Sequence, residues 1–159
     1  MIEYKIQQTG PIFDRGLRDD IIQTDLLAAM HEALIYLERE VKERTPIGAT
    51  GILRGSVFSE IRGQPVNLHG IVASPQQYAA PVEHGTQPHW PPQGPIRLWV
   101  RRKLGIEGDN VNGVAFLVAR KIASKGTDGA HMFEEAFKAG KNTVITIFQK
   151  AGFKVSTKL

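Results

Sequence analysis

Hydrophobic residues recur along this chain at two spacings, one typical of strands and the other typical of helices. Near the N-terminus, Ile2, Tyr4 and Ile6 alternate with polar residues, which predicts a strand with one buried face. From Leu26 to Val41 the apolar residues recur every three or four positions, which predicts an amphipathic helix. The predicted apolar face consists of Leu26, Leu27, Met30, Leu34, Leu37 and Val41.

Polar residues and a proline mark the ends of this first helix. Thr24 offers a side-chain cap and Asp25 an acidic first turn, because a helix N-terminus carries partial positive charge. Lys42 and Arg44 suit the partially negative C-terminal end, and Pro46 cannot continue the helix. We therefore expect the helix to begin at Leu26 and to end before Pro46.

The rest of the chain predicts a hairpin followed by three helices. Residues 46–56 form a loop with three glycines, and the β-rich runs 56–63 and 68–74 are separated by a turn. Gly105 and Gly126 suit positions just past helix ends, and Asp109 or Asn110 suits a helix start. The three helices are expected at Pro95–Leu104, Val111–Ser124 and Ala130–Ala151.

These elements predict an α+β fold. A small, mostly antiparallel sheet is expected to pack against a long N-terminal helix and a long C-terminal helix, with shorter helices between them. In the C-terminal helix, the expected core face consists of Phe133, Ala136, Phe137, Val144, Ile147, Phe148 and Ala151.

Composition places the chain among ordinary globular proteins. Of its 159 residues, 42% are hydrophobic and 23% are charged, and no stretch approaches the ~20 apolar residues of a membrane span. The absence of cysteine excludes disulfides and thiolate metal sites. Residues 1–10 lack the basic and apolar regions of a signal peptide. We expect one soluble domain over residues 1–159, made inside the cell and without a membrane partner.

Motifs for enzymatic chemistry do not occur in the sequence. There is no Gly-x-Ser-x-Gly nucleophile elbow, no phosphate-binding glycine motif, and no cysteine nucleophile. His84, His89 and His131 are not spaced like the ligands of a zinc site, and Glu83 has no second carboxylate near it in sequence. We expect no catalysis, no bound metal and no cofactor; a hydrolase built on His84, His89 and Glu83 is the weaker rival.

Positive charge is concentrated in one predicted helix. Between Glu83 and Glu107 there is no acidic residue, and the segment contains Arg97, Arg101, Arg102 and Lys103. On a helical wheel the four residues Ile96, Trp99, Val100 and Leu104 fall on one side, and the three arginines with Leu98 fall on the other. The basic side is either an ordinary solvated face or a contact to phosphates or to an acidic protein surface.

The two tryptophans receive different interpretations. Trp99 lies on the apolar side of the predicted helix, and we expect it in the core. Trp90 lies in a loop too rich in proline for a strand. Its side chain either folds back onto the domain, which we favour, or is presented to a partner. The candidate interface consists of Trp90, Arg97, Leu98, Arg101 and Arg102.

Two short motifs and their order carry a family resemblance. The first is "TGILRGS", with Thr50, Gly51, Leu53 and Arg54, and the second is "YAAPVEHGT" at residues 78–86. A proline-rich loop, a short helix and finally "GTDGAHMFEEAF" follow. In this order the chain resembles the head-to-tail joining and tail-completion family of tailed bacteriophages and prophages, the gene-ten-like minor tail proteins. The resemblance spans 25–150, and the chain departs from it in a longer stretch at 87–105.

The resemblance implies a structural protein of the virion. Such proteins form a ring of identical copies at the neck, which completes the tail and contacts the tail tube and the head connector. The chain would be found in the bacterial cytoplasm during assembly and then in the virion, in transient contact with phage DNA. A basic nucleic-acid-binding module is the alternative function.

The second motif begins at Tyr78, and within it particular roles are expected for Glu83, Gly85 and Thr86. Gly85 suits a turn with positive φ at the end of a strand, and Thr86 suits a side-chain hydrogen bond after it. Glu83, if partly buried, needs a cationic or amide partner, for which Arg54 is the candidate; otherwise it faces water. The loops at 46–56 and 87–95 are expected to reach neighbouring subunits.

Overall fold

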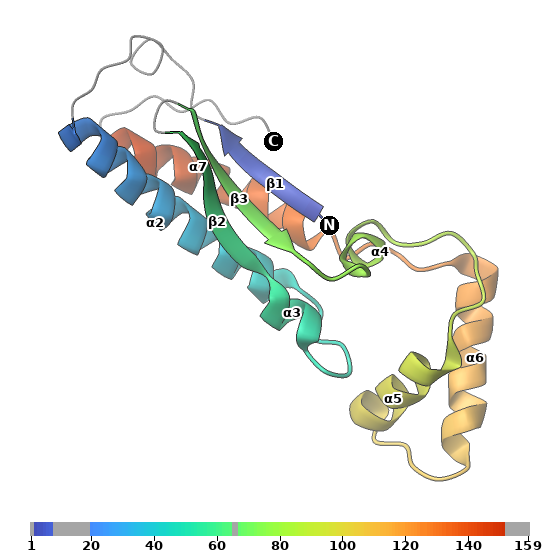
Figure 1. The fold of residues 1–159 in the computed structure, drawn as a ribbon. Coiled ribbons are helices and arrows are strands. Elements are labelled where there is room, and N and C mark those ends of the chain that lie inside the picture. Colours follow the sequence, from blue (N-terminus) through green and yellow to red (C-terminus); the bar gives the residue numbers. More distant parts are fainter. Residues whose placement is uncertain (1, 8–19, 65–66, 152–159) are drawn as a thin grey trace.

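A computed structural model describes residues 2–7, 20–64 and 67–151 of the chain, and structural statements below refer to these residues. They form an α+β body, to which a pair of helices is attached as an arm (Figure 1). In the body, the strands are β1 (Ile2–Gln7), β2 (Phe58–Gln64) and β3 (Asn67–Ser74), and the helices are α2 (Asp20–Arg44), α3 (Ile52–Ser56), α4 (Ala79–His84) and α7 (Met132–Lys150). We use "arm" for residues 87–125, which contain α5 (Gln93–Leu104) and α6 (Asn110–Lys125).

The sheet has the strand order β1-β3-β2, with both neighbouring pairs antiparallel. Ile2 lies opposite Ser74, and Phe58 lies opposite Ala73. The N-terminal strand predicted from alternating residues and the hairpin predicted from two β-rich runs are therefore confirmed. Because β1 pairs with β3 on the side opposite to β2, β3 is the central strand. Val72 of β3 belongs to the core that the sheet forms with the helices, and Ile71, which points to the opposite face of the sheet, is buried as well.

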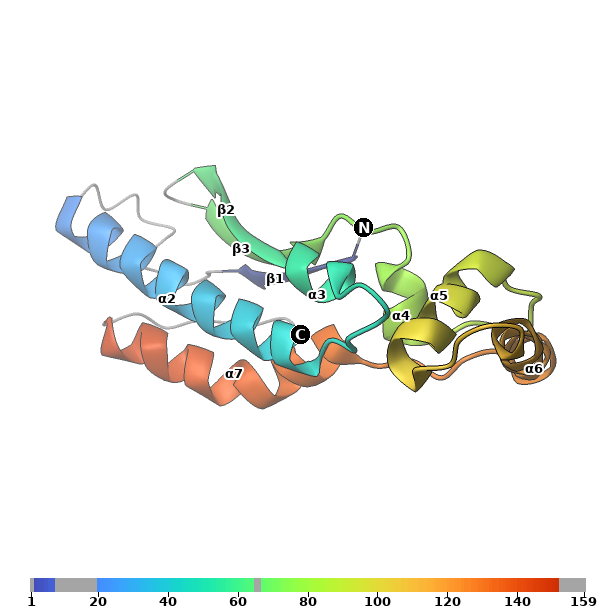
Figure 2. The same cartoon turned by 90° about the horizontal axis from the view of Figure 1, so that it is seen from below.

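Helix α2 lies along the sheet and beside α7 (Figures 1 and 2). A side chain at Gly70 would bring its Cβ within 2.6 Å of the Met30 sulfur, so this glycine permits the close contact between β3 and α2. In the same way a Cβ at Gly140 would approach Leu37 to 2.7 Å, so Gly140 permits the close contact between α7 and α2. The body core is built from these two helices, the sheet and α3.

Helix α2 is longer than predicted. It begins at Asp20 rather than Leu26, so Thr24 and Asp25 lie within the helix and the expected cap at Thr24 is wrong. The apolar spacing in fact extends further, because Ile22 lies four residues before Leu26. Leu27 is 37% exposed, at the edge of the apolar face, whereas the other five predicted core residues are buried.

The other helices agree closely with the predicted ranges. α5, α6 and α7 begin within two residues of the predicted starts, and Gly105 and Gly126 follow α5 and α6 with φ of 64° and 72°. Asp109 precedes α6 but makes no side-chain capping hydrogen bond. Two segments not predicted as helical are short helices: α3 lies within the expected 46–56 loop, and α4 lies where a strand end was expected.

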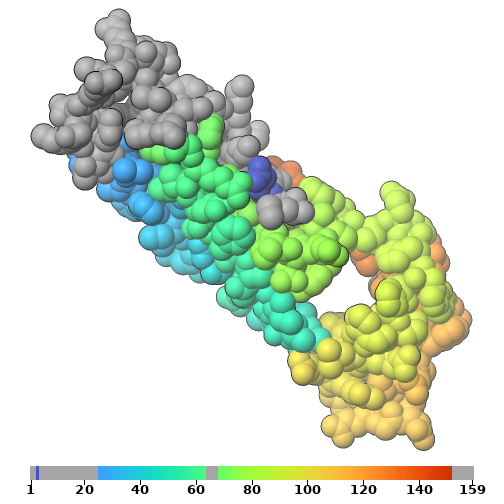
Figure 3. Space-filling model, viewed as in Figure 1, coloured from blue at the N-terminus to red at the C-terminus, as the bar shows by residue number. Residues whose placement is uncertain are grey.

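The arm has a hydrophobic core of its own. Five buried residues fill the space between α5 and α6, and none of them belongs to the core of the body. The space-filling view shows the arm set apart from the body, with an opening between the two (Figure 3). The buried residues of the arm are Ile96, Val100, Val111, Ala115 and Ala119.

Candidate functional site: the cleft between the body and the arm

The arm leaves and re-enters the body at one point. The backbone amide of Thr86 donates to the carbonyl oxygen of Thr127 at 2.9 Å, and the backbone amide of Thr127 donates to the carbonyl oxygen of Thr86 at 3.1 Å. The side-chain hydroxyls of the two threonines lie 2.9 Å apart. The side-chain hydrogen bond predicted for Thr86 is confirmed. Because both ends of residues 87–125 meet at this bridge, it forms the root of the arm.

Glycines make this close crossing possible. Gly85 has a φ of 76°, and a Cβ there would collide with the backbone of Thr127. A Cβ at Gly126 would likewise collide with the carbonyl oxygen of Thr86. The positive φ predicted for Gly85 is therefore confirmed, but the residue ends the short helix α4 and not a strand, since the preceding residues are helical.

The carboxylate of Glu83 is fully buried next to the root of the arm and caps helix α7. Its Oε2 accepts the amide hydrogen of Phe133 at 3.0 Å, and its Oε1 accepts that of Glu134 at 2.9 Å. The carbonyl oxygens of Val82 and Glu83 accept the amides of Ala130 and His131 just before that helix. A negative charge is favourable at a helix N-terminus, where amides lack partners within the helix.

Both interpretations offered for Glu83 from the sequence need correction. The carboxylate does not face water, and its partners are backbone amides of α7 rather than Arg54. The cap was missed because its acceptor and donors are about fifty positions apart in sequence. Arg54 is half-buried on α3 and lines a shallow hollow beside Glu38 and Glu43 of α2.

The two sequence motifs, at residues 50–56 and 78–86, converge on an apolar cleft of about 540 Å³ between the body and the arm. From the first motif it is lined by Thr50, Gly51 and Leu53, and from the second by Tyr78 and Val82. The arm supplies the opposite wall through α5. The remaining lining residues are Pro46, Gly48, Ala49, Ile52, Pro95, Leu98 and Trp99.

Apolar side chains are unusually exposed in and beside this cleft. Ile47 and Ile52 are each 52% exposed, and Tyr78 is 44% exposed. A second cavity of about 350 Å³ shares Pro46, Tyr78 and Val82 with the cleft and extends it toward the root of the arm. Contiguous exposed apolar surface of this kind is typical of a site that binds another molecule.

Helix α5 has three sides, not two as predicted. Ile96 and Val100 are buried against α6, while Leu98 and Trp99 line the cleft. Trp99 is 36% exposed, so its expected place in the core is wrong. The helical wheel gave the wrong prediction for Trp99 because it identifies an apolar side of a helix but does not distinguish a buried side from the wall of an open cleft.

The three arginines of α5 divide between two sides of the helix. The guanidinium of Arg102 donates to the carbonyl oxygen of Ala49 at 3.1 Å, which links α5 to the loop on the other side of the cleft. Arg97 and Arg101 are exposed and, at ~100° per residue, project away from the cleft. Leu98 and Arg102 are therefore at the cleft, and Arg97 and Arg101 are not.

Trp90 lies on a second exposed patch of the arm. Its ring packs against that of Phe116 of α6, with centroids 5.7 Å apart and planes tilted by 59°. Trp90 thus folds back, but onto the arm and not onto the body. Trp90 is still 53% exposed, and Leu117, which follows Phe116 in sequence, is exposed as well.

The arm carries the positive charge of the chain. It has seven Lys and Arg residues against two Asp and Glu residues, which gives +5, whereas the rest of the chain has thirteen against fourteen, which gives −1. Among the described residues, no cation of the arm has an ion-pair partner within 4.0 Å. The cations of the arm are thus available to an external acidic group.

Cations of the body are largely paired within it. Lys42 lies 2.5 Å from Glu38, and Arg44 lies 2.7 Å from Glu40. Burial alone would raise the pKa of Glu38, but hydrogen bonds from Lys42 and from the hydroxyl of Ser59 outweigh it and hold the pKa below its usual value. The carboxylates of Glu38 and Glu40 are therefore already paired with cations of the same helix, α2.

The histidines do not form a cluster. His89 contacts the carbonyl oxygen of Gln87, His131 contacts Glu134 at 3.0 Å, and His84 is exposed at the end of α4. Within the described part of the chain, no group of three or more His, Cys, Asp or Glu residues is arranged to hold a metal ion.

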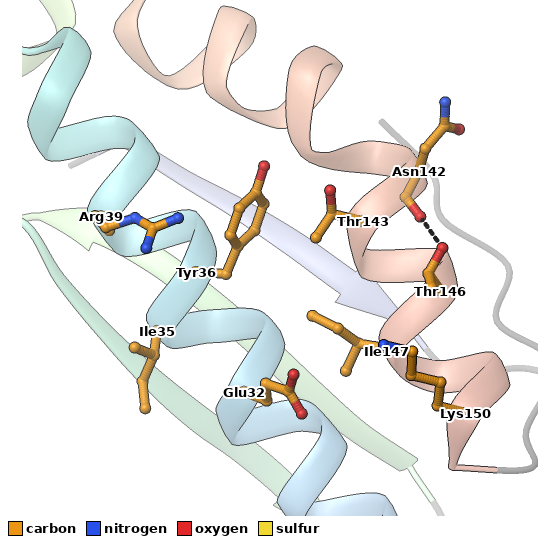
Figure 4. A pocket seen from close by; sticks show the side chains of 9 residues that line it. All are labelled: Glu32, Ile35, Tyr36, Arg39, Asn142, Thr143, Thr146, Ile147 and Lys150. Carbon is orange, nitrogen blue, oxygen red and sulfur yellow. Dashed lines mark hydrogen bonds between the residues drawn. The ribbon is translucent and has the colours of Figure 1, made fainter.

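A groove between α2 and α7 forms another hollow, also of about 540 Å³ (Figure 4). Glu32, Ile35, Tyr36 and Arg39 of α2 line one side of it, and residues of α7 line the other. Charged and hydroxyl groups of both helices make this groove more polar than the cleft, and it contains no residue of either motif. The cleft between the body and the arm is therefore the stronger candidate.

Comparison with known proteins found no matching family model, no matching curated protein and no matching solved structure. None of the helices in the described ranges combines the length and apolar character needed to cross a membrane.

Proposed function

We propose that this chain is a structural protein of a tailed bacteriophage or prophage, which completes the tail or joins it to the head as a ring of identical copies. The observation that carries the proposal is the convergence of both family motifs, "TGILRGS" and "YAAPVEHGT", on the root of the arm and the cleft beside it. In this proposal the motifs position an arm for binding, and the chain performs no catalysis and needs no cofactor.

The two-part architecture supports assembly into a ring. Contacts between unlike surfaces of identical subunits close into a ring only if the geometry of each subunit is fixed. The body supplies a rigid core, and the bridge between Thr86 and Thr127 fixes where the arm emerges. The exposed patches on the arm then supply contacts to neighbours, to the tail tube or to the head connector.

Deletion of the gene from the phage or prophage that carries it tests this function. We expect heads and tails to accumulate without joining, and purified protein added to such an extract to restore joined particles. Light scattering over a range of concentrations should show self-association. Infectious particles at the normal yield after deletion would refute the proposal.

The basic arm also favours a second candidate, a nucleic-acid-binding module. Its charge of +5 suits a phosphate backbone, whose binding weakens steeply as salt increases. Salt-dependent binding of duplex DNA by the isolated chain, together with normal particles after gene deletion, would favour this alternative. The exposed apolar residues of the arm favour the structural role, because phosphates gain nothing from them.

A further inference from the structure

We propose that the cleft between the body and the arm binds an extended segment of an unlike partner protein, one that is acidic and carries apolar side chains, rather than a second copy of this chain. This inference rests on the proposed function and assigns the cleft to the tail or head protein that the ring contacts. The ring contacts between identical copies would then lie elsewhere on the surface.

The lining of the cleft specifies the apolar part of the segment. Leu98 and Trp99 of α5 form one wall, and Ile52 and Tyr78 form part of the other, all of them substantially exposed. Large apolar and aromatic residues that are exposed around a hollow are the usual anchors of a protein interface. The continuation of the cleft past Pro46 toward the root of the arm gives it the elongated form that suits an extended chain.

Charge specifies the rest of the segment. Arg102 stands at the edge of the cleft on an arm of charge +5, whose cations lack ion-pair partners among the described residues. An acidic segment is attracted to such a surface, and a basic one is repelled. A carboxylate of the segment would approach the guanidinium of Arg102 while apolar side chains enter the cleft.

A second copy of the chain is a poor match for this surface. Outside the arm the whole chain carries a net charge of only −1, and Glu38, Glu40 and Glu134 are already paired with Lys42, Arg44 and Lys138 of their own helices. An arm that docks on a neighbouring subunit would therefore meet a chain that is close to neutral in net charge outside its own arm. Charge complementarity favours an unlike, acidic partner.

Peptide binding by the purified full chain tests the assignment. The probes are short overlapping synthetic peptides that cover the head connector, the tail tube protein and this chain itself, with a duplex DNA oligomer as a further probe. Trp90→Phe leaves Trp99 as the sole tryptophan, so its fluorescence reports binding in the cleft. Calorimetry with the unsubstituted chain provides a second readout that does not depend on that variant.

Matched variants separate the cleft from the rest of the arm. Leu98→Asp introduces a charge in the cleft, and Leu117→Asp makes the same change on an exposed part of α6 outside it. Arg102→Gln removes the charge at the cleft, and Arg101→Gln removes one on the other side of α5. Circular dichroism checks that each variant is folded.

We expect a peptide that is acidic and contains apolar residues, from the connector or the tube protein, to bind best. Leu98→Asp should weaken it by about tenfold or more, and Arg102→Gln should weaken it more than Arg101→Gln does. Leu117→Asp should leave it unchanged. If the cleft variant does not fold, the comparison of Arg102→Gln with Arg101→Gln decides the same question.

Several results would overturn this assignment. These are binding of no peptide, best binding of a peptide from this chain, best binding of a neutral or basic peptide, equal weakening by Leu98→Asp and Leu117→Asp, or a response of Trp99 to DNA alone. Gene deletion separates the two proposals: unjoined heads and tails together with no peptide binding would refute only the cleft, whereas normal particles would refute the structural role itself.

Discussion

Removal of the Glu83 carboxylate should destabilise the fold more than any other single loss of charge among the described residues. Its two oxygens accept the amides of Phe133 and Glu134 at the N-terminus of α7, and the side chain is fully buried. A hydrogen bond to a charged group contributes about 1.5–3 kcal/mol, so Glu83→Ala should cost about 3–6 kcal/mol. That is a large fraction of the ~5–15 kcal/mol by which proteins of this kind are stable.

A conservative change at the same position divides this effect. Glu83→Gln keeps one acceptor oxygen but places an amide group where the second amide hydrogen needs an acceptor, so about half of the loss is expected. Glu135→Gln is the control, because Glu135 is exposed and its contact with Lys138 is that of a surface pair, for which ~0–1 kcal/mol is typical.

Urea denaturation at neutral pH measures these losses, and amide hydrogen exchange locates them. In Glu83→Ala, faster exchange should begin at Phe133 and Glu134 and spread along the first turn of α7. A loss below about 1 kcal/mol for Glu83→Ala, or a loss equal to that of Glu135→Gln, would refute the capping role.

Three further predictions concern the core, the pH dependence and the basic helix. Leu34→Ala should cost about 2–5 kcal/mol in denaturant melts, because Leu34 is buried between α2 and the sheet; a loss below ~0.5 kcal/mol would contradict its burial. The lowered pKa of Glu38 stabilises the fold fully above the ordinary pKa of 4.5, and this stabilisation is lost as the pH falls through the lower folded-state value. Glu38→Gln should therefore flatten the acid limb of the stability curve measured by urea denaturation, and an unchanged limb would be the contrary result. Arg97→Glu combined with Arg101→Glu should leave the melting temperature nearly unchanged, because both side chains are exposed, yet stop the completion or joining of tails; infectious particles at the normal yield would return these arginines to the role of a solvated face.

Local patterns in the sequence were sufficient to predict most elements of the fold. Alternation predicted β1, β-rich runs around a turn predicted the hairpin, and helical spacing predicted the two long helices, because one face of each helix is buried in the core of the body. Glycine chemistry also identified Gly85 and the ends of α5 and α6. The predicted start of α2 was wrong, because Thr24 is a suitable capping residue but the apolar spacing continues upstream to Ile22 and the helix begins at Asp20.

The site depended on contacts that local patterns do not contain. Glu83 meets the amides of α7 only when α4 and the start of that helix are brought together, and Arg102 meets Ala49 across 53 positions of sequence. Trp99 was assigned to the core because apolar periodicity identifies a face but not what covers it. The division into body and arm likewise emerged from two separate cores and not from composition.

Electron cryomicroscopy of the neck of the phage or prophage particle tests the central claim most directly. The account predicts a ring of copies at the end of the tail, in which each subunit shows the body and, emerging at the bridge between Thr86 and Thr127, the α5–α6 arm. Density for an unlike protein should occupy the cleft beside Leu98 and Trp99. A complete neck and tail that contain no density for this chain would contradict the account.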